Sequence, residues 1–399
     1  ALREKWPNKI ILAGGPVPSG SYREIFRDTK SYDALCYGEA EIPLLELIEV
    51  NDEKLVLAKG SSWITNDKVD RGEQFSHNVI DDLDEIPFYD YDLVDAKKYG
   101  LNPAITAYHG VTSHEKNFHF ITSLGCPFKC TFCASWKVHG RRMRYWSVDR
   151  VKQDLIRLKE KFNAKTIVIQ DDHFMGDPER ALEIVNILGS LELKVVFQNG
   201  LAMYALSRKF LEALKSAGVE QLLLSIESGN KDTLRLMKKP LKLDIVERVV
   251  EDCRELGIYT NANILIGMPG ETSEDIEVTR KFLKTISPNW FMIFVASPLV
   301  GSEMYEEAVE KGYLKEGFVG GADFKRAVIQ TEDWDQQYIQ EVTYFLNLEM
   351  NFVNNSDMRL GKYSLALRGL ENAIRARADH ALAYYYGGIC HGHLGDQNK

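Results

Sequence analysis

Cysteine is scarce in this sequence of 399 residues and is not spread along it. Three of the six cysteines stand within eight positions, at Cys126, Cys130 and Cys133, and the others are isolated, at Cys36, Cys253 and Cys390. Secreted proteins that depend on disulfides place paired cysteines along the whole chain. The sequence therefore predicts a reducing compartment, which we take as the cytoplasm, and a metal site at the clustered cysteines.

The sequence also lacks long apolar runs, a positive net charge and an amino-terminal targeting pattern. No run reaches the roughly 18 to 20 apolar residues that span a bilayer, and the first residues lack the order of a signal peptide. The net charge of −9 disfavours a broad nucleic-acid surface, and we interpret RRMR at 141–144 as a solvated turn. Since the chain starts without Met and stops within a repeat pattern, we expect a fragment of a longer protein.

Apolar segments alternate with helical segments between residues 118 and 301. Strands are predicted at 118–124, 166–170, 195–199, 221–227, 261–266 and 290–296. Helices are predicted at 147–162, 178–190, 207–217, 231–256 and 272–285, with N-caps at Ser147, Asp177, Ser207 and Thr272. Such long connections require parallel strands with right-handed crossovers. Six units are fewer than the eight of a closed barrel, so we predict an α/β fold with a partial (βα)6 TIM-like barrel.

The segments on either side of this core have their own patterns. Residues 1–55 are predicted to be the second half of an open, Rossmann-like α/β sheet, and 56–110 a linker to the core at 111–320. A helical extension follows at 321–355. Leu360-Gly361 is repeated as Leu394-Gly395 34 residues later, which is the period of tetratricopeptide repeats, so such repeats are predicted from residue 356. An ordinary helical hairpin that caps the core is the alternative.

The clustered cysteines directly follow the first predicted strand of the core. In parallel α/β folds the chemistry collects at the carboxyl ends of the strands, so this loop lies where a site is expected. Three thiolates can hold three irons of a [4Fe–4S] cube and leave the fourth iron open. A zinc site with His139 as the fourth ligand is the alternative.

The motif CPFKCTFC, with its C-x3-C-x2-C spacing and Phe132 before the last cysteine, resembles the radical S-adenosylmethionine (SAM) superfamily. The resemblance implies that Cys126, Cys130 and Cys133 bind the cluster. It further implies SAM contacts from segments at successive strand ends, namely Phe132, Asp171, Asp172, Ser225, Glu227, Ile266 and Gly267, of which the last two offer backbone to the adenine. The two aspartates can alternatively cap a helix, and the glycine can serve only its turn. Substrate-shell candidates at the same strand ends are Gln198, Asn199 and Asn261.

The segments GGP at 14–16 and YGEAE at 37–41 resemble radical SAM proteins with a cobalamin-binding domain. That resemblance implies cobalamin contacts from Gly14, Gly15, Gly38 and Glu39. Ala40 departs from the Gly-Glu-Gly-Glu turn of this subclass. The string Asp-x-His-x-x-Gly, which supplies an axial histidine in many cobalamin domains, occurs at His173, but it lies in the wrong domain, and we interpret it as a coincidence.

The resemblance implies a radical SAM enzyme that cleaves SAM reductively to a 5′-deoxyadenosyl radical, with methylation of an unactivated carbon as the leading reaction. An electron donor such as flavodoxin or ferredoxin is implied, and the repeat segment suggests a protein partner. A methylthiotransferase-like enzyme is one alternative, although its second cluster needs three upstream cysteines and only Cys36 precedes Cys126. A non-catalytic zinc and repeat scaffold is the other alternative. The substrate is not readable from the sequence.

Overall fold

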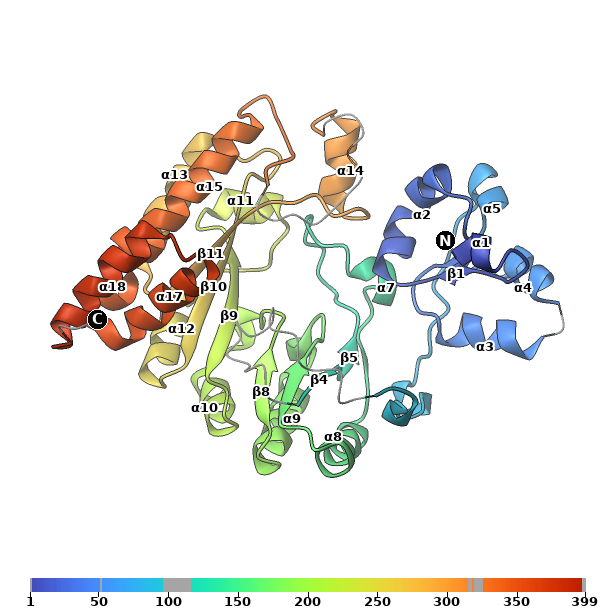
Figure 1. The fold of residues 1–399 in the computed structure, drawn as a ribbon, viewed down its shortest axis with the longest axis horizontal. Coiled ribbons are helices and arrows are strands. Elements are labelled where there is room, and N and C mark those ends of the chain that lie inside the picture. Colours follow the sequence, from blue (N-terminus) through green and yellow to red (C-terminus); the bar gives the residue numbers. More distant parts are fainter. Residues whose placement is uncertain (1, 51, 96–115, 315–317, 319–325, 397–399) are drawn as a thin grey trace. The chain divides into compact units, whose positions relative to one another are not determined.

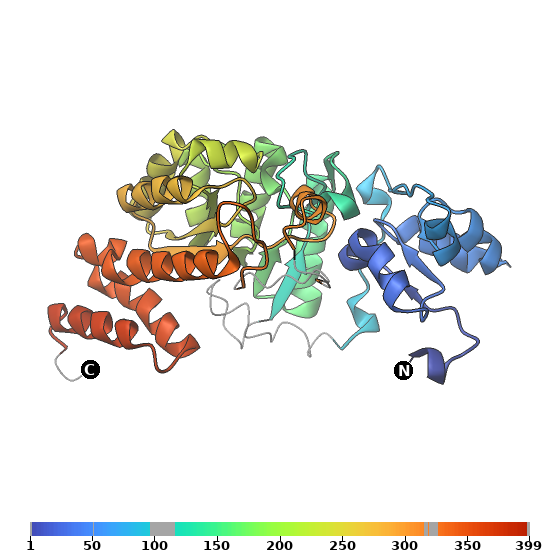
Figure 2. The same cartoon turned by 90° about the horizontal axis from the view of Figure 1, so that it is seen from above.

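The computed structural model describes residues 2–50, 52–95, 116–314, 318 and 326–396 (Figures 1 and 2). The chain divides into two compact units, each built from three separate segments. Unit 1 consists of Ala1–Pro87, Ser123–Ser147 and Ser297–Asp323. Unit 2 consists of Phe88–Thr122, Val148–Ala296 and Phe324–Lys399.

Unit 1 contains a three-stranded sheet near the amino terminus. Strand β1 (Leu12–Ala13) pairs in parallel with β2 (Ala34–Cys36), and β3 (Trp63–Ile64) pairs with β2 in the antiparallel direction. The helices around it are α1 (Leu2–Lys5), α2 (Pro16–Asp28), α3 (Glu41–Glu49), α4 (Glu53–Lys59) and α5 (Asn66–Asp70). Helix α2, strand β2, a turn at Gly38 and helix α3 follow one another here, so the segment has the α/β alternation predicted for residues 1–55. Ordered elements also continue into the segment predicted as a linker, of which residues 96–110 lie outside the described residues.

The cysteine segment of unit 1 is bracketed by a short antiparallel pair. Strand β5 (Ser123–Leu124) pairs with β6 (Arg144–Tyr145), and α7 (Trp136–His139) lies between them in sequence. The remaining described helices of this unit are η1 (Leu83–Glu85) and α14 (Glu303–Glu310). The sequence predicted one strand over 118–124, which is wrong in one respect: the structure separates it into β4 (Asn117–Phe120) and β5, which pair with different partners.

Unit 2 contains two parallel three-stranded sheets. The first has the order β4–β7–β8, with β7 at Thr166–Ile169 and β8 at Lys194–Phe197. The second has the order β9–β10–β11, at Gln221–Glu227, Tyr259–Ile266 and Trp290–Val295. An isolated parallel bridge joins Leu201, just after β8, to Leu224 of β9. The parallel pairing predicted from the long connections is confirmed within both sheets.

The helices between these strands start where capping residues predict. They are α8 (Val148–Phe162), α9 (Pro178–Ser190), α10 (Arg208–Ser216), α11 (Lys231–Leu236), α12 (Asp244–Glu255) and α13 (Ser273–Thr285), with short 3-10 turns η2 (Tyr91–Leu93), η4 (Phe174–Gly176) and η5 (Met203–Ala205). Asp177 and Ser207 accept backbone N–H groups of the first turns of α9 and α10. Thr272 and Asp275 form a capping box on α13. Each such cap contributes about 1 kcal/mol to stability.

The carboxyl-terminal part of unit 2 is helical. It comprises α15 (Gln336–Leu348), the π-helix η6 (Glu349–Val353), α16 (Ser356–Arg359), α17 (Tyr363–Ala376) and α18 (Ala381–His393). Helix α15 lies against β11, and α17 and α18 form an antiparallel pair (Figure 1). Ala366, Leu370 and Ala383 are buried between these two helices. Among the described residues, no helix is both long enough and apolar enough to cross a membrane.

Candidate functional site

The three clustered cysteines of unit 1 lie on a loop, are half-exposed and form no disulfide. The Cys133 N–H donates to the Cys130 carbonyl at 3.1 Å, and the Cys126 N–H donates to the Gly140 carbonyl at 3.4 Å. Gly125 has a φ of +88°, and a Cβ there would lie 2.3 Å from the Arg142 carbonyl oxygen. Only glycine therefore permits this close return of the loop onto the segment that follows α7.

The donor set of this loop fits a cluster better than a single metal ion. No three His, Cys, Asp or Glu side chains in the described part of the chain gather to hold one ion. A cube does not require such a gathering, because each thiolate binds a different iron. Nδ1 of His139, the alternative fourth zinc ligand, lies 2.9 Å from Oε1 of Glu39 and is engaged there. In the zinc alternative, His139 would therefore bind the ion through Nε2.

Glu39, predicted to contact cobalamin, is buried and bonded to the segment after the cysteines. One nitrogen of Arg144 donates to Glu39 Oε2 at 2.9 Å, and a second donates to Oε1. Burial raises the pKa of Glu39, but hydrogen bonds from His139 and Arg144 outweigh it, so its pKa is lower than usual. The interpretation of 141–144 as a solvated turn is wrong for Arg144, which is buried because this carboxylate neutralises it.

The two glycine segments predicted to contact cobalamin meet at Ser19. The Ser19 hydroxyl donates to the Gly15 carbonyl at 2.8 Å and accepts the Gly38 N–H at 2.9 Å. Gly14 is exposed, whereas a Cβ at Gly38 would lie 2.3 Å from the His77 ring. Ser19 could not be identified from the sequence, since a serine in a helix has many possible partners.

Asp171, at the carboxyl end of β7 in unit 2, is a buried structural link. Its carboxylate accepts the Thr122 N–H at 2.8 Å and the Thr122 hydroxyl at 2.7 Å. Arg180 donates to the Thr122 carbonyl at 2.7 Å and so completes the link. The neighbouring Asp172 is half-buried. Of the two predicted SAM contacts, Asp171 thus already has partners that fix the end of the strand.

Glu227 ends β9 in the left-handed conformation, with a φ of +66°. A charge this far along an apolar strand is costly without a partner, and Lys239 Nζ lies 3.1 Å from Glu227 Oε1. Ser225 faces Gly200, where a Cβ would lie 1.9 Å from the Ser225 hydroxyl oxygen. The glycine after β8 therefore provides the room for Ser225.

The Glu271 carboxylate stabilises the turn after β10, and this residue was not predicted from the sequence. The Gly267 N–H donates to Glu271 Oε2 at 2.7 Å, and the Ala296 N–H donates to the Ile266 carbonyl at 2.8 Å. Gly267 has a φ of +89°, and a Cβ there would lie 2.8 Å from Ile339. The two predicted adenine contacts are thus held through their backbone atoms, Gly267 by the Glu271 carboxylate and Ile266 by the N–H of Ala296.

The polar residues at the other strand ends of unit 2 form a row. Gln170 bonds to His119 at 2.9 Å and also donates to Gln198. Asn199 donates to the carbonyls of Gln170 and Asp171 at 3.0 and 2.9 Å. The structure therefore gathers two of the predicted substrate-shell residues, adds His119 to them and gives Asn199 a structural role.

Three other predicted residues have separate surroundings. Asn261 is buried within β10, and Phe132 of unit 1 is half-buried. His173 Nε2 lies 3.1 Å from the Tyr204 hydroxyl, and burial lowers the pKa of His173. The imidazole is thus engaged within unit 2.

Glu271 makes stability depend on pH. Burial raises its pKa to about 7, against hydrogen bonds from the Gly267 and Met268 N–H groups that lower it. Because the pKa of Glu271 is higher in the folded than in the unfolded protein, its contribution to the unfolding free energy is fully present below about pH 4.5. This contribution is lost as pH rises through 7. Relative to Glu271→Gln, the wild type should lose about 3 kcal/mol of unfolding free energy between pH 4.5 and 7.5. Urea unfolding of both proteins measures this, and parallel pH profiles would contradict it.

Comparison with known proteins relates these strands and their loops to one family. Residues 120–283 match the model described as the radical SAM superfamily. These residues form a radical SAM domain. The match begins at the last residue of β4, before the cysteine loop, and ends within α13, so it contains the cysteines and the turn at Gly267.

Curated relatives of the chain include two methyltransferases. An uncharacterized methyltransferase of Pyrococcus horikoshii is 29% identical over 309 residues, which are 77% of this chain and 64% of the relative. The cytidylyl-2-hydroxyethylphosphonate methyltransferase of Streptomyces wedmorensis is 28% identical over 283 residues, which are 69% of this chain and 53% of the relative. The chain thus spans less than two thirds of the length of these relatives.

Two solved structures share the α/β fold of this chain. The cobalamin-dependent S-adenosylmethionine radical enzyme OxsB, with aqua-cobalamin and SAM bound, superposes with a TM-score of 0.66 and 15% identity over 96% of this chain and 62% of OxsB. The radical SAM methyltransferase TsrM of Kitasatospora setae, with cobalamin and a [4Fe–4S] cluster bound, gives 0.55 and 16% over 76% of this chain and 58% of TsrM.

Proposed function

We propose that this chain is the radical SAM part of a cobalamin-dependent enzyme that methylates an unactivated carbon. The observation that carries the proposal is the loop with three cysteines at C-x3-C-x2-C spacing, none of them in a disulfide, within a radical SAM domain. The printed names of the two relatives as methyltransferases, and the cobalamin in the two structures of the same fold, support the specific reaction.

The proposed architecture joins the two parallel sheets of unit 2 into one partial six-stranded barrel. The bridge between Leu201 and Leu224 supports this, because it lies between the two sheets in the expected order. We also propose that α17 and α18 are the start of tetratricopeptide-like repeats, through which a protein partner binds. The cytoplasm is the proposed location, since iron–sulfur chemistry and six free cysteines suit a reducing compartment.

The proposed roles of the residues follow the predicted assignments. Cys126, Cys130 and Cys133 hold the cluster. The SAM contacts are Phe132, Asp172, Ser225, Glu227, Ile266 and Gly267, while Asp171 positions the end of β7 through Thr122. Gly14 and Gly15 lie toward the cobalamin, and Gly38 and Glu39 support the turn beside them.

The bound cluster supplies one electron, delivered by a donor such as flavodoxin or ferredoxin, for the reductive cleavage of SAM to methionine and a 5′-deoxyadenosyl radical. The protein's own residues bind and orient SAM and shield it from water. Lys239 holds the Glu227 carboxylate, so that its second oxygen can accept hydroxyl groups of a ribose. Glu271 fixes the turn at Gly267, which leaves the carbonyl of that residue to face a base.

Anaerobic reconstitution with iron and sulfide tests the proposal. The protein should become brown, bleach with dithionite and convert SAM to 5′-deoxyadenosine. A colourless protein with one bound zinc per chain would instead support the scaffold alternative. The methylthiotransferase alternative predicts two clusters per chain, so an iron content of about eight rather than four, with three cysteines needed for each cluster, would favour it.

A further inference from the structure

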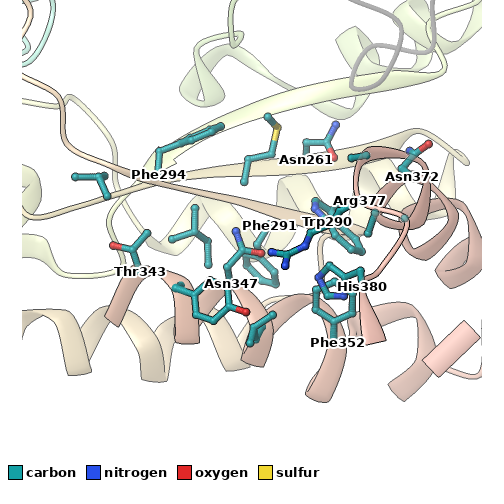
Figure 3. Close-up of a pocket in the computed structure, with 18 of the residues that line it drawn as sticks. Asn261, Trp290, Phe291, Phe294, Thr343, Asn347, Phe352, Asn372, Arg377 and His380 are labelled. Atoms are coloured by element: carbon teal, nitrogen blue, oxygen red, sulfur yellow. The ribbon is translucent and has the colours of Figure 1, made fainter. Parts of the chain in front are cut away.

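A cavity of about 440 Å³ lies in unit 2 between the sheet edge at β11 and the helices α15 and α17 (Figure 3). Every residue of β11, from Trp290 to Val295, lines it. Because a strand of this length extends about 20 Å, the cavity is elongated. It is of the size that holds small molecules in other proteins.

One face of α15 and η6 follows this sheet edge with polar side chains four residues apart. Asn351 stands at one end of this row. Its side-chain amide accepts the Phe291 N–H and donates to the Phe291 carbonyl, both at 2.8 Å. Asn347 accepts from Asn351 at 2.9 Å. Residues four apart lie on the same helix face, so Thr343 is the next on this row, and Figure 3 shows it on the cavity wall.

Thr343 lacks the partner that its neighbours on the row have. It is 7% exposed, and in the described part of the chain its hydroxyl has no hydrogen-bond partner. A buried hydroxyl without a partner costs about 1–3 kcal/mol. Thr343 lines the cavity, but its hydroxyl oxygen is itself covered. A rotation about χ1 would turn the hydroxyl toward the cavity, where an oxygen atom of a bound molecule would satisfy it.

The rest of the lining selects against charge. Aromatic and aliphatic side chains share the walls with uncharged amides; Trp290, Phe291, Phe294 and Phe352 are among the aromatic residues. Among the described residues of the lining there is no Asp, Glu or Lys. Arg377 lines the cavity too, but it is paired with Asp379 at 2.8 Å and both are exposed. A charged ligand would therefore lose its hydration without gaining a buried counter-charge.

We propose that this cavity binds the substrate of the enzyme. The substrate is an uncharged, elongated and mainly apolar molecule with an oxygen that accepts a hydrogen bond from the Thr343 hydroxyl. The cavity reaches Val295, which precedes Ala296, the residue bonded to Ile266 at the predicted adenine segment. Calling the ligand the substrate rests on the proposed function, whereas the binding site itself does not.

Prodan, an uncharged planar naphthalene ketone that fluoresces more strongly and at shorter wavelength in apolar sites, is the probe. It should bind the purified protein with a stoichiometry of one. Thr343→Val should weaken binding about five- to tenfold, because the shape is kept and one hydrogen bond is lost. Ala373→Phe, which fills the cavity, should abolish binding. Unchanged melting temperatures of both variants would show that they fold.

Thr233→Val is the matched control, since Thr233 in α11 is also buried with an unpartnered hydroxyl but does not line the cavity. It should leave prodan binding unchanged. Absent binding, or binding that neither cavity variant changes, overturns the inference. If the reconstituted protein binds prodan normally but does not cleave SAM, the proposed function and the substrate assignment are both wrong. The cavity would then still be a ligand-binding site.

Discussion

Alanine at Cys126, Cys130 or Cys133 should abolish reductive SAM cleavage, with a loss of at least a thousandfold in 5′-deoxyadenosine formation. Each thiolate holds one iron, so the cube loses a ligand that no neighbouring residue replaces. Iron per chain after anaerobic reconstitution should fall with each substitution. Formation of 5′-deoxyadenosine measures the activity, and absorption of the cluster measures its assembly independently.

Alanine at Cys36 or Cys253 is the matched control and should leave cluster assembly and SAM cleavage unchanged. Burial raises the pKa of the Cys36 thiol to about 11 and that of Cys253 to about 12. Both side chains therefore stay protonated in the core and do not serve as iron ligands. Persistent SAM cleavage in any single variant of the clustered three would show that the cluster is held elsewhere.

Glu39→Gln should lower the unfolding free energy of unit 1 by about 3–5 kcal/mol, because it leaves the Arg144 charge buried without a counter-charge. Iron retention should fall as well, since Arg144 belongs to the strand that pairs with β5 next to the cysteine loop. Because the folded pKa of Glu39 is below its unfolded one, its stabilisation is present above about pH 4.5 and lost at lower pH. Chemical unfolding and iron analysis measure both effects.

Asp81→Asn is the control for an ion pair near the same segment. Asp81 pairs with Arg142, and both side chains are well exposed, so the loss should not exceed about 1 kcal/mol. The double variant Glu39→Gln, Arg144→Met should recover much of the loss, because it removes the unpaired charge. Equal effects of Glu39→Gln and Asp81→Asn would contradict the role of the buried pair.

The strands and helices of unit 2 are predictable because their signals are local. Buried parallel strands such as β7 appear as continuous apolar runs, and Asp177 or Thr272 marks the first turn of a helix. The cysteine spacing is local too, which is why the candidate metal site is evident from eight residues.

Contacts between distant segments could not be predicted in this way. Glu39 and Arg144 are 105 positions apart, and nothing near either residue shows that they meet. The same holds for Asn351, which occupies the edge of β11, and for the cavity beside it. The change of partner between β4 and β5 was missed because apolar residues lie on both sides of Thr122 and Ser123, so that residues 118–124 resemble one strand.

The cysteine loop depends on a late part of the chain. The Thr131 carbonyl, within the loop, accepts the Met304 N–H at 2.8 Å, and both belong to unit 1. A ribosome adding about 5–20 residues per second needs on the order of 10–30 s to travel from one to the other. During synthesis the thiols therefore emerge long before their surroundings are complete, so cluster insertion should be a late step of maturation. Nascent chains arrested before residue 297 should acquire less iron than released ones.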